Sequence, residues 1–433
     1  MASCFAVLAI TLLYYKLKES LPQPTTRFLR GSEIVSSKKL ANQTRERSRN
    51  AERPQFFLGD VPIPAELEDR HFLLVGTSGS GKSTAIRQLL PIVRMRGTRA
   101  IIMDLGGEFV SQFQQPNDFV FCPGNIESVS WNPLTEIQNE QDIDLVLSAM
   151  IPRGATPEEE TWRGYCRNFM KALMLRIHED GELTLERLRH YTSCGDKEQT
   201  AFLQGGNSPY KVNATTLTGT VKDMIKDVMQ GLRPVKEVGE FSVREWVRRG
   251  QGFLFITPNN NQRAALSTLI NTFMNLAIAE ALSAPFEQRY SPLFIVADEL
   301  AAFDFDDLPG VLERGRKYGL TACAGIQNAA QLRQKYGNNG ATTLLACFRV
   351  KVIFNPGDSE TAELMAREIG RQEIEHRNYS QTKMSKGGSA TIGYSKTDRY
   401  TVMPEELMKL PDRDGYLKLV GNYPIAKVRI PLT

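Results

Sequence analysis

The sequence predicts an α/β fold, a P-loop NTPase core with an inserted all-α domain. Three observations predict it. A glycine-rich stretch at 76–83 lies between an apolar run and a helix-like segment, and further apolar runs later in the chain each end in polar residues. Between them, residues 137–249 show helical periodicity and almost no strand pattern. Alternating strand and helix signals are typical of an α/β core, which a purely helical stretch can interrupt as a separate domain.

The glycine-rich stretch has the form G-x-x-x-x-G-K-[ST], with a strand-like run at 72–75 before it and a helix signal at 84–90 after it. This order makes a P-loop more probable than a chance glycine-rich turn. Its backbone N–H groups and the following helix N-terminus would face phosphate oxygens. We expect Lys82 to reach the β- and γ-phosphates of ATP and Ser83 to bind Mg²⁺. The expected nucleotide-binding residues are Gly76, Thr77, Ser78, Gly79, Ser80, Gly81, Lys82, Ser83 and Thr84.

Two later strand-like runs end in polar side chains that suit hydrolysis. Residues 293–297 are apolar and are followed by Asp298 and Glu299. We expect Asp298 to hold the Mg²⁺ and Glu299 to take a proton from the attacking water. Residues 320–326 are followed by Gln327, which can sense the γ-phosphate or hold the water. The alternatives are a strand that simply ends in acidic residues and an ordinary loop glutamine.

Asp104 and Glu108 follow another strand-like run and leave two interpretations open. They can approach the metal or the attacking water, or they can have a capping or structural role. The sequence does not decide between these roles.

The composition is compatible with a nucleic-acid partner and makes a zinc site unexpected. The chain has 433 residues and a net charge of +4, which allows a nucleic-acid partner only where basic residues cluster. Six scattered cysteines without a C-x-x-C pair and only four histidines make a zinc site unexpected, and reduced thiols fit the cytosol.

The chain divides into five expected regions. Residues 1–18 are apolar and end in tyrosines and lysines, like the cytoplasmic end of a transmembrane helix; the alternative is a terminal helix of a soluble protein. Residues 19–58 form a basic cytoplasmic linker. Residues 59–136 are the first part of the nucleotide-binding domain, 137–249 the all-α domain, and 250–433 the second part. Within the last, 383–396 reads as a polar, glycine-rich loop.

These segments together resemble the type IV secretion coupling proteins, the TraD/TrwB family of conjugative DNA-transfer ATPases. The similarity runs from about residue 27 to the end. Besides the P-loop and the inserted helical domain, its carriers are residues 104–108 (DLGGE), 131–133 (WNP), 294–299 (FIVADE), 315–320 (GRKYGL), 324–327 (AGIQ) and 423–428 (YPIAKV).

The resemblance implies a RecA-like ATPase that forms a homo-oligomer, as a hexameric ring, on the cytoplasmic side of the bacterial inner membrane. It implies delivery of single-stranded DNA, with its relaxase or relaxosome, to type IV secretion channel proteins. It also assigns Arg316 to a neighbour's ATP site as an arginine finger, with Arg314 and Arg349 as the next candidates and a surface arginine as the alternative. The family carries two membrane helices, of which this chain has at most the end of the second.

Two groups of basic residues could contact DNA phosphates, without preference for DNA sequence. For the first group named below, a solvated helix face is the better explanation. The groups are Arg163, Arg167 and Lys171, and Arg244, Arg248 and Arg249. Two other functions remain open: an assembly or protein-translocating ATPase without direct DNA motor activity, and a scaffold that binds ATP only to set its ring geometry. The adjacent Asp298 and Glu299 favour turnover over a scaffold.

Overall fold

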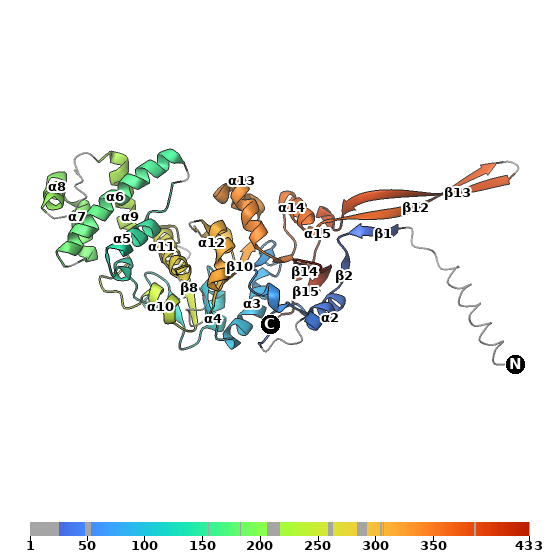
Figure 1. Ribbon diagram of the computed structural model, residues 1–433, viewed down its shortest axis with the longest axis horizontal. Coiled ribbons are helices and arrows are strands. Elements are labelled where there is room, and N and C mark those ends of the chain that lie inside the picture. The colour runs from blue at the N-terminus through green and yellow to red at the C-terminus, as the bar shows by residue number, and fades with distance from the viewer. Residues whose placement is uncertain are drawn as a thin grey trace.

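The computed structural model describes residues 26–47, 53–154, 156–181, 183–205, 217–258, 263–283, 292–303, 305, 307–384 and 387–432. The helix expected at residues 1–18 lies outside this set. Figure 1 shows an elongated molecule with helices α6–α9 at one end, the sheet of the core in the middle, and a long hairpin at the other end. No helix in the described parts is both long enough and apolar enough to cross a bilayer.

The core is a ten-stranded sheet in which seven neighbouring strands, from β11 to β7, run parallel. Strand β14 pairs antiparallel with β11 and with β15. The order across the sheet is β2 (Ile34–Ser36), β15 (Ile425–Arg429), β14 (Asp414–Leu419), β11 (Val350–Ile353), β5 (Phe72–Val75), β10 (Leu320–Ile326), β9 (Leu293–Ala297), β6 (Arg99–Met103), β8 (Phe253–Ile256) and β7 (Phe119–Phe121).

Both faces of this sheet are buried. Along β5, Leu73 and Val75 belong to one apolar cluster, whereas Phe72 and Leu74 belong to the other. Alternate residues of a strand point to opposite faces, so a continuous apolar run is what a doubly covered strand requires. The helices of the core are α2 (Ser37–Arg47), α3 (Lys82–Met95), α4 (Glu108–Phe113), α11 (Arg263–Ala281), α12 (Leu308–Gly315), α13 (Ala329–Cys347), α14 (Ser359–Ile369) and α15 (Pro404–Leu407).

Short elements connect this framework. One of them is a two-stranded hairpin of β3 (Phe57–Leu58) and β4 (Val61–Pro62). Single turns of 3₁₀ helix occur at η1 (Ala65–Leu67), η2 (Pro133–Glu136), η6 (Leu300–Ala302) and η7 (Arg316–Tyr318).

The regular structure in the described parts of residues 140–249 is helical. They are α5 (Glu140–Met150), α6 (Pro157–Glu179), α7 (Leu185–Ser193), α8 (Asp196–Gln204), α9 (Gly219–Gly231) and α10 (Val243–Arg249). On α6, Phe169, Leu173 and Ile177 repeat every four residues and are buried, whereas Tyr165 is exposed. The helix ends next to Gly181, whose φ of +83° suits glycine.

A buried carboxylate, Glu136, joins the two ends of this helical segment. It accepts hydrogen bonds from Trp131 Nε1 at 2.7 Å, Ser242 Oγ at 2.8 Å and the Val243 N–H at 2.7 Å. The chain therefore leaves and re-enters the core at one fixed point.

Two sequence-based expectations differ from the structure. The polar loop was expected at 383–396, but residues 383–384 and 387–396 continue the strands β12 (Arg371–Met384) and β13 (Gly387–Tyr400). These strands pair with each other, and β12 also pairs with β1 (Thr26–Gly31). The range expected as a linker also contains β1, β2 and α2. The strands of the hairpin extend away from the core (Figure 1), and the alternation that reveals a half-buried strand is missing from their sequence.

Candidate nucleotide site

The P-loop follows β5 and is tied to both neighbouring strands. The Gly76 N–H donates to the Ile326 carbonyl at 3.0 Å, and the Thr77 N–H donates to the Asn355 carbonyl at 2.8 Å. Gly81 begins α3 with a φ of +119°, a conformation that side-chain-bearing residues rarely adopt. The loop is therefore held in shape by the carboxyl ends of β10 and β11.

Lys82 lies buried over the loop. Its Nζ donates to the carbonyls of Gly76 at 2.7 Å and Thr77 at 3.0 Å. Burial lowers the pKa of its ammonium, and the nearby carboxylates of Asp298 and Glu299 oppose that shift. These contacts hold the Lys82 ammonium at the loop where the sequence predicts that phosphate binds.

Ser83 and Asp298 meet at the carboxyl edge of the sheet. Ser83 Oγ donates to Asp298 Oδ2 at 2.8 Å. The second carboxylate oxygen, Oδ1, is buried and has no hydrogen-bond partner among the described residues. Burial raises the pKa of Asp298, while the bond from Ser83 and the charge of Lys82 lower it. A hydroxyl and a carboxylate with a free oxygen are ligands that suit Mg²⁺.

Glu299 lies beside this pair. Both of its carboxylate oxygens are buried and neither makes a well-formed hydrogen bond in the described chain, although the Gln327 amide and the Ala301 N–H lie near them. Burial raises the pKa of Glu299, and Lys82 and the amide of Gln327 lower it from nearby. Glu299 and Gln327 share a cavity of about 550 Å³ with Gln331, Gln334 and Lys335. A buried carboxylate that lines a cavity with room for water is suited to accept a proton from that water.

Arg316 lies at the opposite edge of the sheet. It precedes β10, whereas the P-loop is bound to the far end of that strand. Seven residues of strand span about 23 Å. Arg316 Nε pairs with Asp69 Oδ2 at 2.7 Å, and half of its side chain is exposed. The structure thus keeps Arg316 away from its own chain's P-loop.

The two other candidate arginines also lie outside this chain's nucleotide site. Arg314, in the last turn of α12, pairs with Asp307 at 3.4 Å, and exposed Arg349 directly precedes β11 at the same edge as Arg316.

Asp104 caps a helix. Its carboxylate accepts hydrogen bonds from the N–H groups of Glu108, Phe109 and Val110 at 2.8–3.1 Å. Glu108 pairs with Arg87 on α3. Of the two interpretations left open by the sequence, these contacts favour the structural one.

The structure adds one residue to the site that sequence reasoning missed. The Arg413 N–H donates to the carbonyl of Ser80 at 2.8 Å, and its Cα lies 3.0 Å from where a Cβ on Gly81 would be. Arg413 has a φ of +68°, uncommon for a residue with a side chain. It lies in a turn more than 300 residues from the P-loop, and no motif marks it.

The basic residues on α6 and α10 form ion pairs with acidic residues of the same chain. Arg163 pairs with Glu159 at 2.5 Å, Arg167 with Glu160 at 2.6 Å and Lys171 with Asp144 at 2.7 Å. On α10, Arg244 and Arg248 share Glu280, and Arg249 pairs with Glu245. These ion pairs favour a structural role over a phosphate-binding stripe.

Comparison with known proteins gives consistent matches over most of the chain. Residues 55–431 match the family model described as type IV secretion-system coupling protein DNA-binding domain. Coupling protein TraD of Escherichia coli K12 is 29% identical over 395 residues, covering 86% of this chain and 54% of TraD. Conjugal transfer protein TraG of Rhizobium radiobacter is 22% identical over 411 residues, covering 85% of this chain and 63% of TraG. The chain thus spans about half to two thirds of these relatives.

Solved structures agree. The plasmid coupling protein TrwB in complex with ADP and Mg²⁺ is 30% identical with a TM-score of 0.80, covering 95% of this chain and 96% of TrwB. Its complex with the non-hydrolysable ATP analogue ADPNP has a TM-score of 0.79. VirB4 of Thermoanaerobacter pseudethanolicus, at 14% identity and a TM-score of 0.54, shares the fold alone. The likeness to TrwB confirms the predicted fold class, a RecA-like P-loop NTPase core with an all-α domain.

Proposed function

The chain belongs to the family of type IV secretion-system coupling proteins, and on that premise we propose that it hydrolyses ATP to move single-stranded DNA, with its relaxase, to a type IV secretion channel. The observation that carries the proposal is the convergence of four side chains at the carboxyl edge of the sheet. Lys82, Ser83, Asp298 and Glu299 come from two segments about 215 residues apart, and the 2.8 Å bond between Ser83 and Asp298 joins them.

The site fits ATP with Mg²⁺. Three buried carboxylate oxygens of Asp298 and Glu299 make no well-formed hydrogen bond in the described chain, and the buried Lys82 is held by the carbonyls of Gly76 and Thr77 in the P-loop. Solved complexes of TrwB with ADP and Mg²⁺, and with ADPNP, support the same ligands for this chain. Bound Mg²⁺ would offset the charge that develops on the phosphates.

In the proposed hydrolysis, this chain's residues position the reactants and move one proton. Lys82 and the P-loop N–H groups bind the phosphates, and Ser83 and Asp298 hold the metal. Glu299 takes the proton of the attacking water, for which a buried carboxylate with a raised pKa is suited. Gln327, on the same cavity, orients that water and senses the γ-phosphate.

Arg316 is proposed to complete the site of a neighbouring subunit. Its place at the amino edge of the sheet, a strand's length from its own P-loop, supports action in trans, and its half-exposed side chain can reach a partner. This requires a homo-oligomer in which the amino edge of one core faces the carboxyl edge of the next. A closed ring, hexameric as the sequence resemblance implies, meets that requirement.

The remaining partners are proposed from the family. A domain described as DNA-binding supports contact with DNA, and we expect binding through phosphate without sequence preference. The proposed location is the cytoplasmic side of the bacterial inner membrane. The proposed division is a nucleotide-binding domain at 59–136 and 250–433 around an all-α domain at 137–249.

Steady-state ATPase activity of the purified protein tests the proposal. It should be measured with and without single-stranded DNA, at fixed low salt and across protein concentration. We expect DNA to stimulate turnover, and Lys82→Ala to abolish it while leaving the protein folded. Turnover that responds to a protein client and ignores DNA would instead favour an assembly or protein-translocating ATPase.

A further inference from the structure

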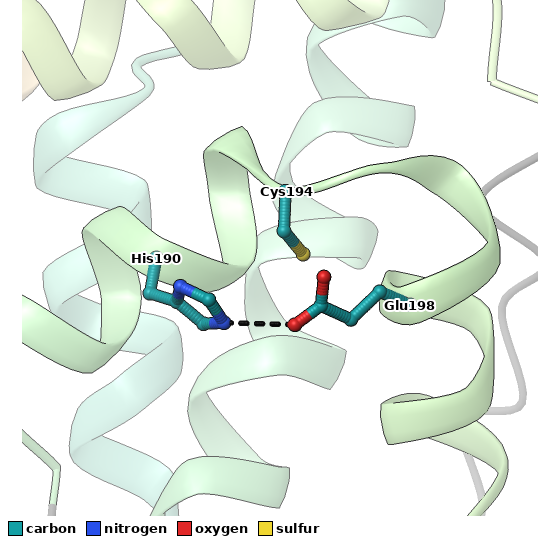
Figure 2. A group of neighbouring side chains, drawn as sticks. All are labelled: His190, Cys194 and Glu198. Atoms are coloured by element: carbon teal, nitrogen blue, oxygen red, sulfur yellow. Dashed lines mark hydrogen bonds and ion pairs between the residues drawn. The ribbon is translucent and has the colours of Figure 1, made fainter.

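We propose that His190, Cys194 and Glu198 form a binding site for a thiol-seeking divalent cation, with Zn²⁺ as the best match. Figure 2 shows the three side chains converging from α7 and α8. His190 Nε2 lies 3.0 Å from Glu198 Oε1, and the three ligand atoms all lie within 4.8 Å of one another. The site belongs to the helical end of the molecule, far from the P-loop (Figure 1).

Helical spacing places these ligands together. His190 lies in the last turn of α7, and Cys194 follows four residues later as its C-cap, so both lie on one side of the helix. Glu198 lies in the first turn of α8, which follows a bend at Cys194 and begins after the N-cap Gly195. Spacing of four residues is a chelating arrangement on a helix, and the bend returns the chain to supply the third ligand.

Contacts that do not involve the three ligand atoms hold the two helices in place. The Cys194 N–H donates to the His190 carbonyl at 2.9 Å. Gln199 Nε2 donates to the Tyr191 carbonyl at 2.9 Å, and the rings of Tyr191 and Phe202 stack with centroids 3.6 Å apart. The ligands are therefore attached to a scaffold that is already assembled, which lowers the entropic cost of binding.

The ligand chemistry selects the metal. An imidazole nitrogen, a thiolate sulfur and a carboxylate oxygen are the donors that Zn²⁺ uses, at about 2.0–2.3 Å. Side-chain rotations that bring the donors together by about 1 Å would give that geometry. Three protein ligands leave a fourth position open to water, and the half-exposed His190 and Glu198 give access from solvent. The thiolate disfavours Mg²⁺ and Ca²⁺, which prefer oxygen donors.

Titration of the full-length, metal-free protein with Co²⁺ tests the proposal, because Co²⁺ reports thiolate ligation by a charge-transfer absorption band. We expect one equivalent to produce the band, Zn²⁺ to displace it, and excess Mg²⁺ to leave it unchanged. A metal ion at the Ser83–Asp298 site has no thiolate ligand and gives no such band. Zn²⁺ should also raise the unfolding temperature.

Matched variants make the test specific. Cys194→Ser should abolish the band and the thermal shift. His190→Ala and Glu198→Gln should each weaken Zn²⁺ binding at least about tenfold, since even outer-shell partners contribute that much. Cys347→Ser and His178→Ala, which alter a half-buried cysteine and a histidine elsewhere, should bind as the wild type does. Unfolding in EDTA checks that each variant is folded.

A band that is absent from the wild type, or that survives Cys194→Ser, would overturn the proposal. So would His190→Ala or Glu198→Gln proteins that bind Zn²⁺ as tightly as the wild type.

Discussion

Ser83 Oγ donates a hydrogen bond to Asp298 Oδ2 over 2.8 Å, although the two residues are 215 positions apart in the chain. Ser83 lies in the first turn of α3 and Asp298 directly follows β9, with β10 between their strands. The proposed metal ligands therefore touch each other in the structure, and Asp298 Oδ1 is buried and has no hydrogen-bond partner among the described residues.

Asp298→Asn should separate metal binding from stability. Removing the charge should weaken the Mg²⁺-dependent part of nucleotide affinity. It should leave the unfolding temperature of the ligand-free protein unchanged or higher, because a buried charge without a full set of partners destabilises the fold. Nucleotide titrations with Mg²⁺ and with EDTA, together with thermal unfolding, measure both effects.

Asp118→Asn is the matched control. The Asp118 carboxylate is fully buried but pairs with Arg94 and accepts the N–H of Phe253. Its replacement should cost about 1–3 kcal/mol of stability and leave nucleotide binding intact. An Asp298→Asn protein that binds Mg²⁺ and nucleotide normally would remove Asp298 from the metal site.

Glu299→Gln should bind ATP and fail to turn it over. The proposed metal ligands remain, but the amide cannot accept the proton of the attacking water, so the rate should fall by about 10²–10⁴-fold. Equilibrium binding of ATP and single-turnover hydrolysis measure the two steps separately. Lost affinity with unchanged hydrolysis per bound ATP would reverse the proposed roles of Glu299 and its neighbours.

The pH profile of hydrolysis should follow the two shifted groups. Burial raises the pKa of Glu299, so activity should rise with pH through a value above that of an ordinary glutamate. Burial lowers the pKa of Lys82, so activity should fall on the alkaline side earlier than for an ordinary lysine. The residual activity of Glu299→Gln should not show this rise with pH. A rise that persists in the variant would mean that another group causes it.

The raised pKa of Glu299 also affects folding. Because this pKa is raised, the Glu299 carboxyl binds its proton more tightly in the folded chain than in the unfolded chain. Its contribution to stability is therefore present below the usual carboxyl pKa and lost as pH rises through the raised value.

Arg316→Ala should be rescued only in mixed oligomers. Arg316→Ala and Lys82→Ala proteins should each be inactive alone, but mixing them creates interfaces with an intact P-loop and an intact Arg316. Partial hydrolysis should return and should rise more steeply than linearly with protein concentration. Arg367→Ala, which alters an exposed arginine on α14, should retain activity by itself. Mixtures that stay inactive when assembly is confirmed would exclude Arg316 from the trans role and direct the same test to Arg314 and Arg349.

Much of the nucleotide site was predictable because its chemistry is local. The P-loop is a continuous motif, Asp298 and Gln327 each directly follow an apolar strand, and Glu299 is next to Asp298. In a parallel sheet the carboxyl ends of such strands meet at one edge, so the sequence pattern alone predicts their convergence. Helical periodicity is likewise a local signal, which is why the helices between residues 137 and 249 were predictable.

The features that the sequence did not predict are a hairpin without apolar alternation and contacts between distant segments. The hairpin of β12 and β13 lacks the apolar alternation of a half-buried strand, so 383–396 reads as a loop. Arg413 reaches the P-loop only through the folding of the C-terminal strands. The ion pair between Arg316 and Asp69 joins residues 247 positions apart, and no spacing rule predicts it.

Movement of DNA tests the central claim most directly. Single-stranded DNA with biotin at one end is bound to streptavidin, and release of the streptavidin is followed with ATP, with ADPNP and with Lys82→Ala protein. The account predicts ATP-dependent release from one end of the strand and none with ADPNP or Lys82→Ala. Sustained ATP hydrolysis with no ATP-dependent release from either end would contradict it.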